Sequence, residues 1–392
     1  MQNEPLTLFI ELNNSEFVFA VGKNIEENEF NLIFVNSINN NINNIKNNFD
    51  EVYRIIKENI ILIEEKLDFI FKEAILLFDN FDSSIINFSG FKKLNGSQLI
   101  KENITYILNS LKLKVSESEK EKKILHIFNS KNLLDKKNTD NIPIGLYGDF
   151  YSHELSFFLI NNNDFKNVKT IFDKCNLKIK KIISKNFLEG IHLIENNENL
   201  DNFFKISINE KNSELVYFEN SSFKFVQKFN FGSNIIINDI SKIIGFDFES
   251  TQKIIGNLNL SDDEYLEKDF FINKNFRKIK KKLLLDVASA RIQEISELLT
   301  FRNINILSFF KKKPKIFLML KKQAHKELFS EKFKEILSNK NEIEVNLLEQ
   351  VNLENYFSDA SKLVQFGWKR EAIPIIHEKK SLLARFFDLF FG

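Results

Sequence analysis

Alternating hydrophobic and polar positions predict one short series of elements near the start of the chain. Strands are expected over Leu6–Leu12, Glu16–Val21 and Phe30–Val35, with a polar turn at residues 13–15 between the first two. A helix is expected over Phe49–Leu67, where hydrophobic residues recur every three to four positions. The pattern predicts a strand meander followed by a helix.

The same series is predicted a second time. Strands are expected over Phe203–Ile208, Ser213–Phe218 and Phe223–Phe229, with a polar turn at residues 209–212 and a helix over Asn238–Ile244. A unit that recurs about 195 residues later predicts a duplicated architecture with two similar lobes. Each lobe would direct one hairpin turn toward a central cleft.

A smaller group of elements lies between the two copies and predicts an α+β insert. The charged stretch Ser116–Lys123 within it is interpreted as a solvated linker. The strands of the insert are expected over Ser84–Phe91, Ile124–Phe128 and Glu154–Ile160, and its helices over Ile100–Leu111 and Phe165–Leu177.

The second half continues with a long helix over Leu283–Leu299, a buried strand over Lys315–Leu320 and a closing helix over Tyr356–Phe366. The segment Lys369–Lys380 follows and contains Pro374. As flexible chain, about twelve residues span about 20 Å, so the body would stay close to whatever the end of the chain binds.

The last twelve residues predict an amphipathic helix whose apolar arc covers about 160°. Such a face needs either a groove on the body of the protein or a lipid surface. The surface of a membrane is the favoured interpretation, because basic residues just before and within the helix add about 1 kcal/mol each on an anionic leaflet. The predicted membrane-binding residues are Lys379, Lys380, Leu382, Leu383, Arg385, Phe386, Phe387, Leu389 and Phe390.

Composition narrows the class of protein. The chain has 392 residues, too many for one ordinary core, and its 43% hydrophobic and 28% charged residues are typical of globular proteins. A net charge of +1 argues against a nucleic-acid-binding protein. Cys175 is the single cysteine, which excludes a disulfide framework and fits a reducing compartment.

Neither a metal site nor a membrane-spanning segment is predicted. The five histidines are scattered and form no ligand cluster. The N-terminus lacks the pattern of a signal peptide, and no apolar run is long enough to cross a bilayer. We therefore expect a cytoplasmic protein that is held at a membrane by its C-terminal helix.

Several passages, in this order and spacing, resemble the FtsA family of actin-like bacterial cell-division proteins. The resemblance covers nearly the whole chain, including the basic amphipathic end. The passages are Ile124-Leu-His-Ile-Phe followed by Ile142-Pro-Ile-Gly-Leu-Tyr-Gly148, Phe172-Asp-Lys-Cys-Asn-Leu-Lys178, Asn234–Leu258, Asp286–Leu299 and Tyr356–Phe366.

The resemblance implies an α/β, actin-like (ribonuclease H-like) fold of two duplicated lobes with an SHS2-type α+β insert and a C-terminal amphipathic helix. It also implies how the chain is divided. The core of lobe 1 would comprise residues 1–83 and 177–200, and the insert would comprise residues 84–176. The core of lobe 2 would comprise residues 201–231 and 283–355, with an upper subdomain at residues 232–282. The chain would end with a closing helix at residues 356–368 that returns to lobe 1, a linker at residues 369–380 and a membrane-targeting helix at residues 381–392.

The function that the resemblance implies is that of an adaptor. The protein would tether the FtsZ ring to the cytoplasmic face of the inner membrane at the division site, as a peripheral membrane protein. Its upper subdomain would capture the C-terminal peptide of FtsZ, and its tail would bind the lipid surface. Other division proteins are implied as partners, nucleic acid is not, and self-assembly into filaments is left open.

The nucleotide-binding turns of the family are replaced in this chain. Its first turn resembles E-I-G-T-x-K but reads Glu11-Leu-Asn-Asn-Ser-Glu16, and its second resembles D-I-G-G-G-T-x-D but reads Ser207-Ile-Asn-Glu-Lys-Asn-Ser-Glu214. The adenosine segment T-G-G becomes Met319-Leu320-Lys321. The degenerate positions are Asn13, Asn14, Ser15, Glu16, Ser207, Asn209, Glu210, Lys211, Asn212, Met319, Leu320 and Lys321.

These replacements predict a protein without a cofactor and without catalytic residues. Glycines let backbone N–H groups approach phosphate closely, and the chain has only 11 glycines and no Gly-Gly pair. Carboxylates in a phosphate pocket would also repel the ligand. Lys211 could contact a phosphate and Asn13 can adopt left-handed turn geometry, so weak binding of ATP and Mg²⁺ is left open.

Two other classes of actin-like protein are alternatives. One is another scaffold, such as a PilM-like type IV pilus assembly protein, which would have a related insert but is not expected to end in a basic amphipathic helix. The other is an actin-fold enzyme, a sugar kinase or chaperone ATPase. The missing glycines and the lack of a catalytic aspartate in either hairpin argue against the enzyme.

Overall fold

The chain forms two compact units of interleaved segments. The computed structural model describes residues 6–13, 16–26, 29–39, 48–78, 81–256, 258, 264–271, 277–320, 326–339 and 343–372. The first unit takes its described residues from 1–43, 62–80 and 177–365, and the second takes its described residues from 44–61, 81–176 and 366–392.

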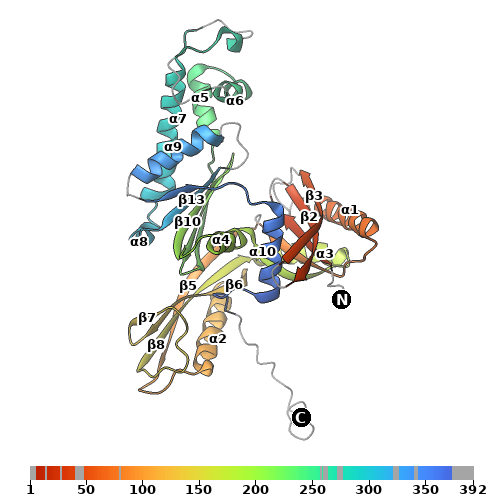
Figure 1. Ribbon diagram of the computed structural model, residues 1–392, viewed down its shortest axis with the longest axis vertical. Helices are drawn as coiled ribbons and strands as arrows, with labels where there is room; N and C mark the ends of the chain where they lie inside the picture. The colour runs from red at the N-terminus through yellow and green to blue at the C-terminus, as the bar shows by residue number, and fades with distance from the viewer. Residues whose placement is uncertain are drawn as a thin grey trace. The chain divides into compact units, whose positions relative to one another are not determined.

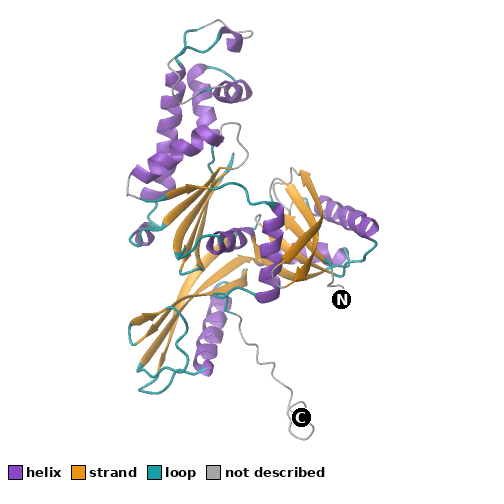
Figure 2. Cartoon of the chain, in the orientation of Figure 1, coloured by secondary structure: helices purple, strands orange, loops and turns teal. Residues whose placement is uncertain are grey.

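The first unit contains two five-stranded sheets of the same design (Figures 1 and 2). In each, three antiparallel strands lie in the order third, second, first, and two further strands continue the sheet in parallel from the first strand. The first sheet comprises β3 (Glu29–Asn39), β2 (Glu16–Glu26), β1 (Thr7–Leu12), β4 (Glu73–Phe78) and β9 (Lys178–Ser184), in this order. The second comprises β12 (Ser222–Phe229), β11 (Ser213–Glu219), β10 (Asn202–Ile208), β13 (Lys315–Leu320) and β14 (Val345–Leu347).

The matching strand orders confirm the predicted duplication. The central strands β1 and β10 are buried along almost their whole length. A strand that is covered on both faces reads as a nearly continuous apolar run, which explains why both were recognisable from sequence.

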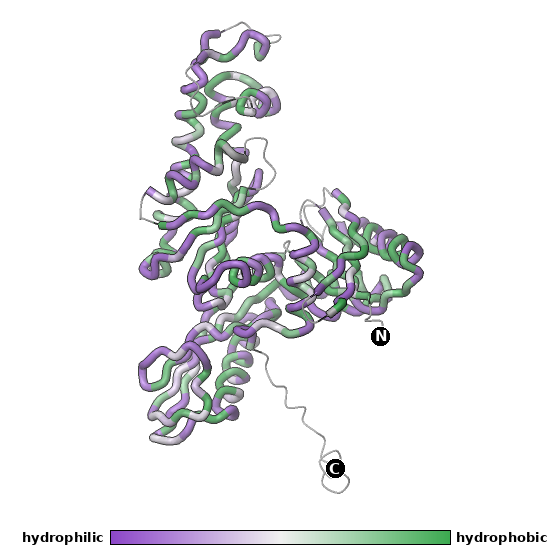
Figure 3. Tube along the Cα trace, in the orientation of Figure 1, coloured by the Kyte–Doolittle hydropathy of each residue, from purple (hydrophilic) through white to green (hydrophobic). Residues whose placement is uncertain are grey.

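Helices cover the sheets of the first unit. On α7, Leu284, Ala288, Ile292 and Ile295 recur at helical spacing and join the core of the second sheet. In Figure 3, hydrophobic and hydrophilic residues alternate along this and the other long helices. The helical segments of this unit are α4 (Lys185–Glu195), α5 (Asn234–Ile244), α6 (Phe248–Gly256), a 3₁₀-helix (Lys268–Phe271), α7 (Lys281–Ser296), a π-helix (Glu297–Phe301), α8 (Leu307–Phe310), α9 (Lys326–Asn339) and α10 (Leu353–Phe366).

The second unit contains the strands and helices that were predicted for the α+β insert, together with parts of residues 44–61 and 366–392. Its sheet has the order β5 (Ser83–Lys93), β8 (Phe150–Asn161), β6 (Lys122–Leu134) and β7 (Lys137–Thr139). Helix α2 (Lys101–Ser118) contributes Leu108, Leu111 and Val115 to a core shared with Phe157 and Leu159 of β8. Helix α3 (Asn162–Lys174) follows β8 directly, and α1 (Phe49–Leu67) has residues in both units.

The predicted elements are largely present. The expected helix over Phe49–Leu67 and strand over Lys315–Leu320 match α1 and β13 residue for residue. The predicted linker over Ser116–Lys123 is wrong, because α2 continues to Ser118 and β6 begins at Lys122. Val115 is buried in the core of the insert and keeps the charged end of the helix folded against the sheet.

The predicted tail helix, residues 381–392, lies outside the described residues. Within the described part of the chain, none of the helices combines the length and the apolar character that crossing a bilayer requires.

Candidate functional site

The two described residues of the first hairpin turn, Asn13 and Glu16, are hydrogen-bonded to each other. The backbone N–H of Glu16 donates to Oδ1 of Asn13 over 2.8 Å, and the N–H of Asn13 donates to the carbonyl of Glu16 over 3.2 Å. Backbone N–H groups of such a turn are what would otherwise bind a phosphate. Here the asparagine side chain already accepts from the N–H of Glu16, so an anion would have to displace it.

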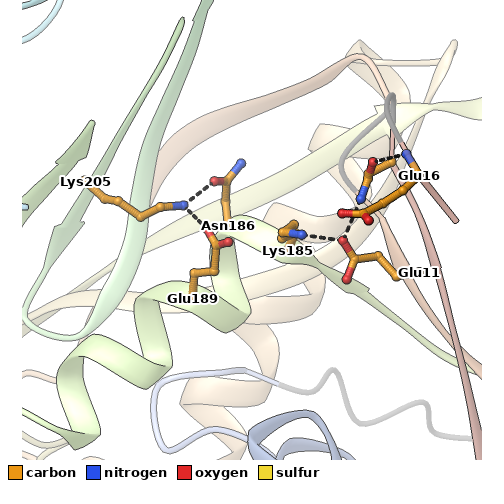
Figure 4. A network of polar contacts seen from close by, with 7 residues as sticks. Glu11, Glu16, Lys185, Asn186, Glu189 and Lys205 are labelled. Carbon is orange, nitrogen blue, oxygen red and sulfur yellow. Dashed lines mark hydrogen bonds and ion pairs between the residues drawn. The ribbon is translucent and has the colours of Figure 1, made fainter. Parts of the chain in front are cut away.

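A buried ion pair lies directly behind this turn (Figure 4). Glu11, at the end of β1, is 2% exposed, and its carboxylate accepts from Nδ2 of Asn13 over 3.0 Å and from Nζ of Lys185. Lys185 is the first residue of α4, and its Nζ also lies 5.4 Å from the ring centre of Tyr356. The ammonium group of Lys185 is therefore paired with the carboxylate of Glu11 and lies near the ring of Tyr356.

Hydrogen bonds also join residues within the second hairpin turn. The N–H of Asn209 donates to the carbonyl of Asn212 over 2.9 Å, and Nδ2 of Asn209 donates to Oδ1 of Asn212 over 2.6 Å. The carbonyls of Asn209 and Glu210 in turn accept from the N–H groups of Ser233 and Asn234, each over 2.9 Å, at the start of α5. Amides at a helix N-terminus are a common place for a phosphate, and here carbonyls of the turn occupy two of them.

Gly232 allows this contact between the turn and α5. A Cβ atom at this position would lie 2.2 Å from the carbonyl oxygen of Asn209. A side chain here would push the start of α5 away from the turn, so the glycine serves backbone packing within the protein.

Helix α4 joins the first sheet to the second through a buried cation (Figure 4). Lys205 of β10 is 1% exposed, and its Nζ donates to Oδ1 of Asn186 over 2.8 Å and to the carboxylate of Glu189. Both acceptors are buried side chains of α4. A buried charge is stable only when it is paired and hydrogen-bonded, so this contact constrains where α4 can lie against β10.

Two further contacts hold the same helix. A Cβ atom at Gly190 would lie 2.0 Å from the ring of Phe218 on β11, so the backbone of α4 lies directly on that ring. His192 lies with Nδ1 2.6 Å from Oδ2 of Asp359 on α10. Lys185 and Glu189 lie one turn apart on α4, and so do Asn186 and Gly190. This single stretch of the helix therefore contacts β1, β10 and β11.

The structure places most of the predicted nucleotide-site positions in or beside the two turns. The β10–β13 register puts Ser207 opposite Met319, and the β10–β11 register puts it opposite Glu214. Asn14, Ser15, Lys321 and all of the predicted membrane-binding residues from Lys379 to Phe390 lie outside the described residues.

Sequence reasoning missed the network formed by Lys185, Asn186, Glu189 and Lys205. One signal was available, since Lys205 is the one charged residue in a mostly apolar strand, and lysine is rarely buried unless it is paired. Its partners could not be found in the same way, because they lie on a helix that belongs to the other half of the duplication.

The described residues contain no cluster of metal-ligating side chains. Asn13, Asn209 and Lys185 each bind a neighbouring group of the protein.

The two matching sheets, each with its hairpin, have the arrangement of an actin-like fold. No family model matches the sequence. The structure is similar to a chain of the PilM–PilN type IV pilus biogenesis complex, at 11% identity and a TM-score of 0.50, over 94% of this chain and 99% of that one. It also matches MreB5 of Spiroplasma citri bound to AMPPNP, at 8% identity and a TM-score of 0.46, over 91% and 96% of the two chains.

The sequence comparison is more specific. The chain is 22% identical over 256 residues to the cell division protein FtsA of Buchnera aphidicola subsp. Schizaphis graminum. The match covers 64% of this chain and 60% of the length of that relative. The resemblance to FtsA is thereby confirmed, and the actin-like fold that it implied is present.

The buried cation on β10 leads to a prediction about stability. Lys205→Ala leaves Glu189 buried without its cation, and we expect the free energy of unfolding to fall by about 3–5 kcal/mol. The double variant Lys205→Met/Glu189→Leu removes both charges and should regain at least half of that loss. Urea unfolding followed by circular dichroism measures both effects.

Lys282→Ala, at an exposed position of α7, is the control and should change stability by less than about 0.5 kcal/mol. A Lys205→Ala variant as stable as this control would show that the ion pair does not hold α4.

Proposed function

We propose that the protein is a cell-division adaptor that tethers the FtsZ ring to the cytoplasmic face of the inner membrane without using ATP. The similarity to FtsA is the observation that carries the proposal, and the actin-like fold agrees with it. The basic amphipathic pattern of residues 379–390 supports attachment to a lipid surface as a peripheral membrane protein at the division site.

The proposed adaptor needs two separate ends. The tail would bind lipid, and the upper subdomain, residues 232–282, would bind the C-terminal peptide of FtsZ. Helices α5 and α6 of this subdomain bury their apolar sides in a core shared with the second sheet, while Ile243 of α5 is 52% exposed. The described part of the subdomain thus offers a helical surface that packs on the core of the second sheet.

Binding to FtsZ is the first test of this function. We expect the protein to co-sediment with polymers of FtsZ from the same organism, and to remain in the supernatant when that FtsZ lacks its C-terminal peptide. Equal sedimentation with both forms of FtsZ, or with neither, would contradict the proposal. The same result separates the adaptor from a PilM-like scaffold, for which the similarity at 11% identity supports the fold alone.

Independence from ATP is the second part of the proposal. It is supported by the closed turns, in which Asn13, Asn209 and Asn212 use side-chain and backbone groups of the turns themselves. Micromolar binding would require about 8 kcal/mol of favourable free energy from this site. Titration with a fluorescent ATP analogue and Mg²⁺ should show no saturable binding in the micromolar range.

An actin-like ATPase titrated under the same conditions is the positive control for this measurement. Saturable micromolar binding by the present protein would sink the ATP-independent part of the proposal and leave the adaptor function standing.

The tail provides a third prediction. Phe386→Glu or Phe390→Glu places a charge in the middle of the apolar arc, and each variant should abolish flotation with liposomes while the body stays folded. Asp388→Asn on the polar arc is the matched control and should float like the wild type. High salt should weaken flotation only partially, because apolar insertion does most of the binding. Unchanged flotation of both glutamate variants would mean that another surface binds the membrane.

A further inference from the structure

Residues 370–372 lie against the sheet of the second unit as a short additional strand. The N–H of Asn129 donates to the carbonyl of Arg370 over 2.8 Å, and the N–H of Ala372 donates to the carbonyl of Ile127 over 2.7 Å. These bonds flank an antiparallel bridge between Phe128 and Glu371. Along this part of β6 the opposite edge is paired with β8, so the segment occupies the edge that would otherwise be open.

Side chains add to these backbone bonds. The side chain of His126 is 1% exposed, and its Nδ1 lies 2.7 Å from Oε1 of Glu371, whose side chain is 10% exposed. Nη1 of Arg370 donates to the carbonyl of Asp140 over 2.5 Å. Ala372 packs against the hydrophobic core of the insert. The segment is therefore held by backbone pairing, a buried polar contact and apolar packing together.

The chain is redirected just before it reaches β6. Helix α10 ends at Phe366, and Gly367 follows with φ of +72°, the left-handed geometry that commonly ends a helix. The N–H of Glu371 then donates to the carbonyl of Trp368 over 2.8 Å, which closes a turn. The described chain ends at Ala372, immediately after this pairing.

We propose that Arg370–Ala372 is a latch, an intramolecular added strand that fixes the root of the C-terminal tail on the edge of β6. The predicted linker over Lys369–Lys380 is corrected at its start, because Arg370 and Ala372 are hydrogen-bonded to β6. A force applied to the tail would act on the sheet of the insert before it acts on α10.

The latch sets the reach of the tail. With the latch closed, about eight residues of the sequence separate Ala372 from the predicted amphipathic helix, and the flexible linker expected from the sequence would span about 16 Å over that length. With the latch open, about fourteen residues would separate α10 from that helix, and on the same expectation they would span about 21 Å. Strand addition to a sheet edge is a recurring way in which proteins bind an extended segment, so this edge is suited to holding the start of the tail.

Hydrogen exchange of individual amides in the full-length protein tests the latch. Ala372→Pro removes the N–H that donates to Ile127, whereas the matched control Ala372→Gly keeps it. We expect exchange of the Asn129 amide to accelerate at least tenfold in Ala372→Pro and to stay within threefold of the wild type in Ala372→Gly. Amides of β8 should be unchanged in both variants.

An unchanged Asn129 amide in Ala372→Pro overturns the proposal. If the amides of β8 also accelerate, the sheet itself is disturbed, and Glu371→Gln replaces the proline variant because it alters only the partner of His126. Acceleration confined to Asn129 in that variant supports the latch, and no acceleration overturns it. The measurement uses neither lipid nor FtsZ, so its result is independent of the proposed function.

Discussion

The buried contact of Lys205 with Asn186 and Glu189 is the interaction on which the rest of the first unit depends. It links the central strand of the second sheet to α4, which follows the last strand of the first sheet. A buried cation that lost these partners would cost several kcal/mol, so the position of α4 is strongly constrained. Lys185, Gly190 and His192 then have fixed neighbours on β1, β11 and α10.

The position of α4 also stabilises the first hairpin turn, and contacts with α5 stabilise the second; neither turn contains a glycine. Glu11 would be an isolated buried carboxylate, but Lys185 and Asn13 are positioned to donate to it. At the second turn, the carbonyls of Asn209 and Glu210 are satisfied by the first amides of α5. Polar groups that a nucleotide could otherwise bind are used to hold elements of the protein together, which is the physical basis for proposing an adaptor independent of ATP.

The second unit has a different role in the proposed adaptor, because its sheet binds the last described residues of the chain. Its sheet would have an open edge at β6, and open edges invite pairing with other chains. Arg370–Ala372 covers that edge and buries the pair formed by Glu371 and His126. The proposed adaptor would therefore combine a body stabilised by internal ion pairs with a tail whose root can be bound or released.

The sequence by itself determined most of the elements and the duplication, because these depend on the local periodicity of hydrophobic residues; the amphipathic end stays a prediction, since it lies outside the described residues. α1 and β13 were predicted residue for residue, and the linker over Ser116–Lys123 failed because charged residues continue a helix as readily as they form a loop. The tertiary structure alone decided the partner of Lys205 and the pairing of Glu371 with His126. These partners are separated by 16 and 245 residues in the chain, and no local pattern records which distant groups folding brings within hydrogen-bond distance.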